Sequence, residues 1–259
     1  MDPVTTVFTA FGSKLAYDVL GPSAKYLGEE LRGLAKVGVE NITRVFEVAH
    51  KRNLELGKTT GAVAPRLLYP LLQSAYLCED ELVASYLGGV LSSARTEVAR
   101  DDRSVGIVRM IDGLSSYALK VHCIMYSSVM AYPTQSPENM LKCMNNGSGV
   151  AVLFDESKLR EQMAFVCEEN PKEILEHAFL SLGAHGLLSG GHRHFRRQKS
   201  EIDGRFCYLS LRGVELFCWG NGQSAGGSLD YFSGRVKNEV TDRVAVEPLA
   251  IELGMVSWA

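Results

Sequence analysis

Histidines in the basic stretch of residues 190–212 have the spacing of metal ligands. His192 and His194 stand two residues apart, and alternate residues of a strand point to the same side, so together with His185 or Cys207 they would supply a zinc site. The spacing fixes no third ligand, however, and the neighbouring arginines would repel a divalent cation. We therefore predict solvent-facing histidines, no metal and no cofactor.

The same stretch is rich in cations that could contact phosphate. It holds six lysine or arginine residues and two acidic residues, a local net charge of +4, as a loop touching a nucleic-acid backbone requires. The preceding helix, residues 172–188, has Lys172 as its only lysine or arginine, whereas helices that recognise base sequence carry Arg, Lys, Asn or Gln. We expect a solvated basic loop, with non-specific phosphate contact as the alternative. The residues of that alternative are Arg193, Arg196, Arg197 and Lys199.

Carboxylates and thiols are the remaining candidates for catalysis. Adjacent carboxylates occur within residues 79–81, 101–102 and 168–169, but neighbours on a helix diverge, whereas general acid–base catalysis needs two groups that converge on one substrate. Six cysteines are scattered without a CxxC pair, and His122 and Cys123 lie about 100° apart on a helix, which is poor geometry for a nucleophile and its base. We therefore expect helix caps, turns and buried thiols, and we predict no catalytic residues.

Composition limits the class of protein further. The chain has 259 residues, of which 46% are hydrophobic and 22% charged, and a formal net charge of −3. This is globular composition with no overall attraction to nucleic acid or anionic lipid. Because no signal peptide is recognisable, we expect reduced cysteines and a cytoplasmic location. The longest apolar stretch contains Arg109, Asp112, Lys120 and His122, which argues against an integral membrane segment.

The elements that would position these residues begin with helices. Residues 13–53 read as helix with a break at Gly21-Pro22, followed by helices at about 65–77, 79–95 and 104–130. A mixed-sign polar face on the first helix favours packing against a core or a partner over binding to a membrane surface. Its apolar face is the predicted interaction surface, formed by Ile42, Val45, Phe46 and Ala49. Residues 131–149 are rich in Pro, Gly and Asn, so we predict an N-terminal helical domain over residues 1–135.

The second half of the chain mixes helices and strands. A short β-branched run at 150–154 indicates a strand, and two helices follow, the second beginning at Pro171. Two strands joined by a polar loop and a final apolar helix complete the order of a winged-helix domain over residues 136–220. Residues 221–259 form a C-terminal tail whose structure the sequence leaves unknown, and the glycine-rich stretch 220–228 reads as a linker. The predicted fold is therefore mainly α, with a helical domain followed by a small α+β winged-helix-like domain.

This order of segments resembles the bacterial Abi-alpha (abortive infection alpha) family over about residues 13–220. The resemblance includes a proline-led helix, an acidic step before an apolar helix, and a closing "LSLGAHGLL…YLSLRGVELFCW" pattern. The matching positions are Pro65, Glu79, Asp80, Leu82, Leu91, Val108, Ile111, Leu114, Leu182, Gly186, Leu187, Leu188, Tyr208, Leu209, Ser210, Gly213 and Phe217. The resemblance implies a role in defence against phage and supplies no catalytic residues.

The sequence thus predicts an interaction protein without enzymatic activity. We expect it to act in bacterial antiphage defence by self-association, as a homo-oligomer, or by binding a protein partner. A nucleic-acid-associated regulator that contacts phosphate through the basic loop is the alternative.

Overall fold

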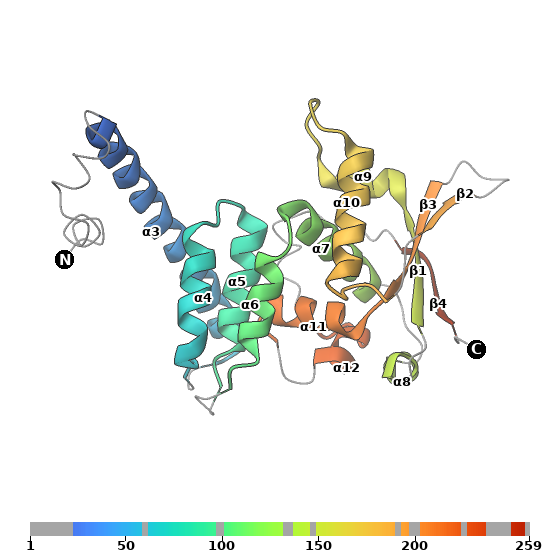
Figure 1. Ribbon diagram of the computed structural model, residues 1–259. Coiled ribbons are helices and arrows are strands. Elements are labelled where there is room, and N and C mark those ends of the chain that lie inside the picture. The colour runs from blue at the N-terminus through green and yellow to red at the C-terminus, as the bar shows by residue number, and fades with distance from the viewer. Residues whose placement is uncertain are drawn as a thin grey trace.

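The computed structural model describes residues 23–58, 62–96, 101–131, 137–145, 149–189, 193–196, 203–223, 227–236 and 250–256. Within these ranges the chain is mainly helical, as predicted, with ten helices and four strands (Figure 1). The helices are α3 (Ser23–Glu55), α4 (Pro65–Tyr76), α5 (Glu81–Ser93), α6 (Ser104–Asp112), α7 (Ser116–Met130), α8 (Pro137–Asn145), α9 (Glu156–Met163), α10 (Pro171–Ala184), α11 (Leu211–Gly220) and α12 (Gly227–Phe232). The strands are β1 (Gly149–Asp155), β2 (Arg193–Arg196), β3 (Asp203–Leu209) and β4 (Ala250–Val256).

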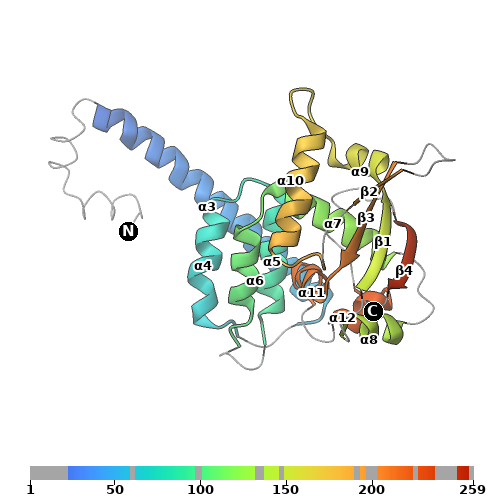
Figure 2. The same cartoon turned by 45° about the vertical axis from the view of Figure 1, so that its right-hand side comes forward.

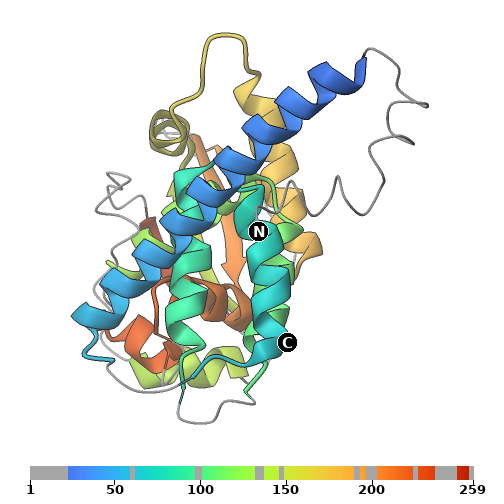
Figure 3. The same cartoon turned by 90° about the vertical axis from the view of Figure 1, so that its left-hand side faces the viewer.

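The helices and the sheet occupy opposite ends of the molecule. Helices α4, α5 and α6 lie side by side at one end, the sheet lies at the other, and α7, α10 and α11 lie between them (Figure 2). Helix α3 crosses α4 and α5, and its N-terminal part extends beyond them (Figure 3).

Helix boundaries follow local capping chemistry. Helix α4 has proline in its first turn, where the missing N–H costs no hydrogen bond. The Asp80 side chain caps α5 by accepting hydrogen bonds from the backbone N–H groups of Leu82 and Val83, at 2.8 and 3.0 Å. The predicted helix 104–130 is two helices, because α6 ends at Gly113 and the Ser115 side chain caps α7.

The sheet is antiparallel with the strand order β2-β3-β1-β4. The predicted strand at 150–154 is β1, and the predicted strand pair within residues 189–211 is the pairing of β2 with β3. In the tail, whose structure the sequence left open, residues 250–256 form β4 and pair with β1 along its other edge. The glycine-rich start of the tail leads into α12, where Tyr231 and Phe232 are buried.

One hydrophobic core joins the two ends of the molecule. It includes Leu71 and Leu87 from the α4–α6 end, Ile124 from α7, and Phe154 and Phe179 from β1 and α10. Nearly every residue from 118 to 129 is buried, because α7 is covered on several sides. The core therefore continues across residue 135, where the sequence suggested a domain boundary.

Candidate functional site

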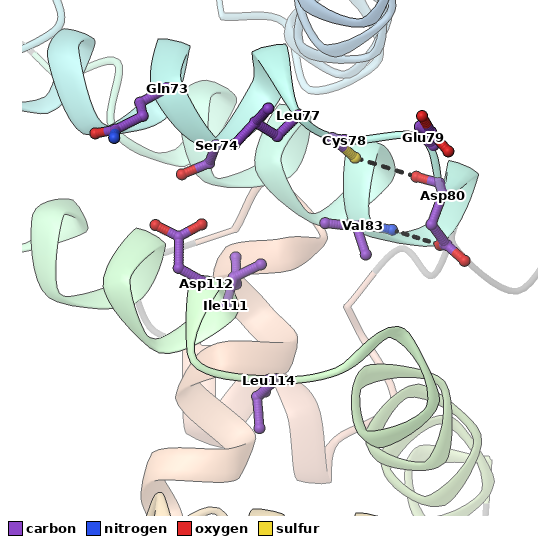
Figure 4. Close-up of a pocket in the computed structure, with 10 residues that line it drawn as sticks. All are labelled: Gln73, Ser74, Leu77, Cys78, Glu79, Asp80, Val83, Ile111, Asp112 and Leu114. Atoms are coloured by element: carbon purple, nitrogen blue, oxygen red, sulfur yellow. Dashed lines mark hydrogen bonds between the residues drawn. The ribbon is translucent and has the colours of Figure 1, made fainter.

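A pocket opens where the end of α4, the start of α5 and the end of α6 meet (Figure 4). Its volume is about 580 Å³. Ten residues line it: Gln73, Ser74, Leu77, Cys78, Glu79, Asp80, Val83, Ile111, Asp112 and Leu114. Three of them are carboxylates and four have branched aliphatic side chains, so the pocket combines negative charge with an apolar lining.

The carboxylates are divided between the two ends of the pocket. Glu79 and Asp80 lie beside Cys78, whereas Asp112 points from α6 towards Gln73 and Ser74 (Figure 4). The Asp80 carboxylate is engaged as the cap of α5. The backbone carbonyl of Glu79 accepts a hydrogen bond from Arg44 at 3.4 Å. Glu79 and Asp112 are therefore the two carboxylates that could receive a ligand without uncapping a helix.

The hydroxyl and the thiol of the pocket are engaged in structural contacts. Ser74 Oγ donates to the carbonyl oxygen of Pro70 at 2.8 Å, and Cys78 Sγ donates to the carbonyl oxygen of Asp80 at 3.2 Å. Burial, and next the charge of Asp80, raise the pKa of the Cys78 thiol to about 11, so the thiol is protonated at neutral pH. No histidine or lysine lines the pocket. This arrangement can bind a ligand but holds no activated nucleophile.

Two apolar side chains at or near α4 are largely exposed. Leu77, which follows α4 directly, is 74% exposed at the pocket, and Tyr69 on α4 is 77% exposed. Lysine and arginine have long aliphatic stems and charged ends. A pocket with aliphatic walls and carboxylates at both ends suits such side chains, presented by a partner protein.

The predicted interaction surface on α3 is only partly available. Val45 and Ala49 are buried, at 0% and 3% exposure, which corrects their assignment to an external surface. The reason is that α3 turns this face towards the chain's own α5, with the side chain of Val48 against Gly88. Ile42 is partly buried against the core, and Phe46 remains 43% exposed.

The predicted basic loop has fewer available cations than its sequence suggests. Arg193 and Arg196 lie in β2, where their backbones pair with Phe206 and Asp203. His192, Arg197 and Lys199 lie outside the described residues. Arg205, one of the six cations counted, is fully buried on β3, so it is no part of a phosphate-binding surface.

Carboxylates and an aromatic ring hold Arg205 in the interior. Its Nε lies 3.3 Å from Glu156 and its Nη1 lies 3.2 Å from Glu176. Its guanidinium carbon also stands 4.4 Å from the centre of the Phe179 ring. The buried cation is thus compensated by charge and by the aromatic ring.

The other residues considered as zinc ligands lie apart in structural roles. His185 Nδ1 donates to the carbonyl oxygen of Ser181 at 2.9 Å, and Cys207 is buried with its pKa raised by burial. Within the described ranges, no three residues among His, Cys, Asp and Glu are grouped as metal ligands would be.

A buried polar network around His122 was not predicted from the sequence. The Tyr86 hydroxyl donates to His122 Nδ1, and His122 Nε2 donates to the carbonyl oxygen of Gly213, both at 3.0 Å. Burial lowers the pKa of His122 to about 4 and raises the pKa of the adjacent Cys123 to about 11. Both side chains are fully buried, so they stabilise the core rather than contact a substrate.

No protein-family model, curated protein or solved structure matches this chain. Among the described residues, no helix combines the length and the apolar character needed to span a bilayer.

Proposed function

We propose that the chain is a non-enzymatic, cytoplasmic interaction protein of bacterial antiphage (abortive infection) defence, which acts by self-association or by binding a protein partner. The observation that carries this proposal is the pocket between α4, α5 and α6. It offers carboxylates and aliphatic walls, and its hydroxyl and thiol donate to the backbone carbonyl oxygens of Pro70 and Asp80. A site of this kind binds a basic side chain and does not turn it over.

The expected partner segment is basic and partly apolar. Glu79 and Asp112 stand at opposite ends of the pocket (Figure 4), which favours a segment that presents two cationic side chains. Hydrogen bonds to ionised groups each contribute about 1.5–3 kcal/mol, so two such contacts would dominate the binding free energy.

The defence context rests on the resemblance to the Abi-alpha family described above. The winged-helix character of residues 136–220 belongs to the same proposal. Its support is the order α9, α10, β2, β3, α11, with the hairpin β2–β3 between two helices. The phosphate-binding alternative stays a prediction for Arg193, Arg196, Arg197 and Lys199, and the buried, carboxylate-paired Arg205 contributes nothing to it.

The test is a double substitution at the pocket, Glu79→Gln with Asp112→Asn. Both changes keep side-chain size and remove charge, and neither uncaps α5. In a bacterial host challenged with phage, we expect protection to fall, and partner affinity to fall about tenfold or more, equivalent to at least about 1.4 kcal/mol.

Glu161→Gln is the matched control, because it removes one exposed carboxylate on α9, far along the chain from the pocket. Full protection by the double variant, with protection by the control also unchanged, would contradict a role for the pocket. Loss of protection in both variants would show that surface charge in general, rather than this pocket, is what matters.

A further inference from the structure

A second pocket opens where the end of α8, one face of α11 and the start of α12 meet. Its volume is about 730 Å³, within the range of about 300–1,000 Å³ that is typical of sites for small ligands. Helix α12 packs on both α8 and α11, and the three helices lie together in the lower part of Figures 1 and 2. This pocket shares no lining residue with the pocket between α4, α5 and α6, so it is a separate site.

Helix α11 presents two opposite charges to this pocket. Arg212 and Glu215 are both exposed and stand three residues apart on the helix, so they lie on the same face with their Cβ atoms about 5–6 Å apart. Neither side chain forms a hydrogen bond or an ion pair with another residue in the described part of the chain. Arg103, on which the charge of Glu215 also acts, is paired with Asp101 at 2.7 Å. The guanidinium and the carboxylate at the pocket are therefore both available to a ligand.

Apolar side chains form much of the remaining surface of the pocket. They come from all three helices, namely Leu141 from α8, Leu211 and Trp219 from α11, and Leu229 from α12. Trp219 is buried, and the three leucines are half-buried. An apolar group of a ligand that contacts these side chains is removed from water, which favours binding.

The thiol of this pocket is engaged and protonated. Cys218 Sγ donates to the carbonyl oxygen of Gly227 at 3.2 Å. Burial, and next the charges of Asp230 and Glu215, raise the pKa of the thiol to about 12. At neutral pH the thiol is therefore not a nucleophile, and the pocket is suited to binding rather than to covalent catalysis.

We propose that this pocket binds a small zwitterionic peptide of about two apolar residues. Arg212 binds the C-terminal carboxylate, because a guanidinium group can donate two parallel hydrogen bonds to a carboxylate, and Glu215 binds the N-terminal ammonium. The ends of an extended dipeptide are at most about 7 Å apart, comparable to the separation of Arg212 and Glu215 on the helix, whereas both charged groups of a free amino acid share one carbon atom. The apolar side chains of the peptide contact the leucines and Trp219. This inference goes beyond the proposed function and does not depend on it.

Calorimetric titration of the full chain with leucyl-leucine tests the proposal. We expect the dipeptide to bind, and two capped ligands to bind at least about tenfold more weakly. These ligands are leucyl-leucinamide, which lacks the carboxylate, and N-acetyl-leucyl-leucine, which lacks the ammonium. Free leucine supplies both charges but only one apolar side chain, so it should also bind more weakly than the dipeptide.

Variants of the two charged residues show which end of the ligand each one contacts. Arg212→Gln should weaken the binding of leucyl-leucine about tenfold or more and leave the affinity for leucyl-leucinamide unchanged, because that ligand has no carboxylate. Glu215→Gln should likewise weaken the binding of the dipeptide and leave the affinity for the acetylated ligand unchanged. Arg109→Gln and Glu161→Gln, at exposed positions outside the pocket, are the matched controls and should change none of these affinities. A circular-dichroism melt confirms that each variant is folded.

Four results would overturn the proposal. The folded wild-type chain would bind no leucyl-leucine up to millimolar concentration, or it would bind the capped ligands as tightly as the dipeptide. Equal affinity for free leucine would exclude a peptide of two residues as the ligand. Binding that both pocket variants leave unchanged, or that the controls weaken equally, would place the site elsewhere. None of these results affects the phage challenge with variants of Glu79 and Asp112, which tests the proposed function independently.

Discussion

His122 shows how burial sets the charge of a single residue in this molecule. Its Nδ1 accepts a hydrogen bond from the Tyr86 hydroxyl, which requires that this ring nitrogen carry no proton. The imidazole ring also stacks on the ring of Tyr126, with 4.5 Å between the ring centres. Because the interior disfavours the imidazolium ion, the pKa of His122 is lowered from 6.5 to about 4. The neutral form is therefore part of the folded structure at neutral pH.

We expect the free energy of unfolding to fall as the pH is lowered from about 6.5 towards 4. In the unfolded chain His122 takes up a proton near its ordinary pKa of 6.5, whereas in the folded chain it does so only near 4. Protonation therefore favours the unfolded state between these two pKa values. The stability that the buried neutral His122 contributes is fully present above pH 6.5. The linkage between proton binding and folding predicts that the free energy of unfolding falls by about 3 kcal/mol at the low end of this pH range. Urea unfolding at a series of pH values measures it.

His122→Gln and His50→Gln form the matched pair for this prediction. The first removes the buried titrating group and should flatten the pH dependence, at the cost of lower stability at neutral pH. The second changes an exposed histidine on α3 and should leave the dependence unchanged. An equally steep fall in His122→Gln would assign the effect to other groups.

The candidate pocket could be predicted from the sequence only in part, for reasons visible at its residues. An acidic helix start at residues 79–81 was predicted, and Asp80 is that cap. Asp112 comes from a separate helix, so its place opposite Ser74 depends on how α4 and α6 pack (Figure 4). Local sequence patterns carry no information on that packing. The burial of Arg205 was missed for the same reason, because its partners Glu156 and Glu176 lie on other elements.

At the scale of elements, Arg205 connects β3 to two helices. Glu156 opens α9 and is 4% exposed, and Glu176 lies on α10. Arg160, one turn along α9, also contacts Glu156 at 2.8 Å. These ion pairs hold α9 and α10 against the sheet. Because hydrogen-bonded ion pairs are directional, they fix the orientation of the two helices more closely than apolar contacts would.

Glu156→Gln should destabilise the protein by about 3 kcal/mol, because it removes the carboxylate charge beside a buried guanidinium. Combining it with Arg205→Met should recover part of that loss, since the pair is then replaced by groups that carry no charge. Urea denaturation of the single and double variants gives the coupling between the two residues. Glu161→Gln, at an exposed position on the same helix, is the control and should change stability by less than about 0.5 kcal/mol. A similarly small effect of Glu156→Gln would contradict the structural role.

Element boundaries agreed with sequence patterns wherever local chemistry decides them. Pro65 and Pro171 begin helices, and Asn170 caps α10 as its side chain accepts from the N–H of Glu173. Strand β4 was missed because its pairing partner, β1, lies far away along the chain. The residues before β4 show no repeating hydrophobic pattern, and β4 itself is short. Only its pairing with β1 therefore identifies it as a strand.

At the scale of the whole molecule, contacts tie the N-terminal helices to the C-terminal half. Arg52 donates to the carbonyl oxygen of Ser85 at 2.7 Å and also to that of Gly220. Lys58 Nζ donates to the carbonyl oxygens of Ser92 and Gly222, at 3.1 and 2.7 Å. Lys58 lies at the C-terminal ends of α5 and α11, and Arg52 reaches the C-terminal end of α11, where the helix dipoles favour positive charge. The end of α3 is therefore bound to the end of α11.

The last prediction concerns how the chain unfolds. Because α10 and α11 pack against α7 and the core includes residues on both sides of position 135, a fragment of residues 1–135 would expose most of α7 to water. We expect this fragment to show no cooperative unfolding transition, and the full chain to unfold in one transition with coincident midpoints by circular dichroism and tryptophan fluorescence. Trp219 is buried on α11, so its fluorescence reports on the C-terminal half while the helical signal comes largely from the N-terminal half. A folded fragment, or two separated midpoints in the full chain, would instead establish a boundary between independently stable domains near residue 135. Each half would then bury enough surface to fold alone.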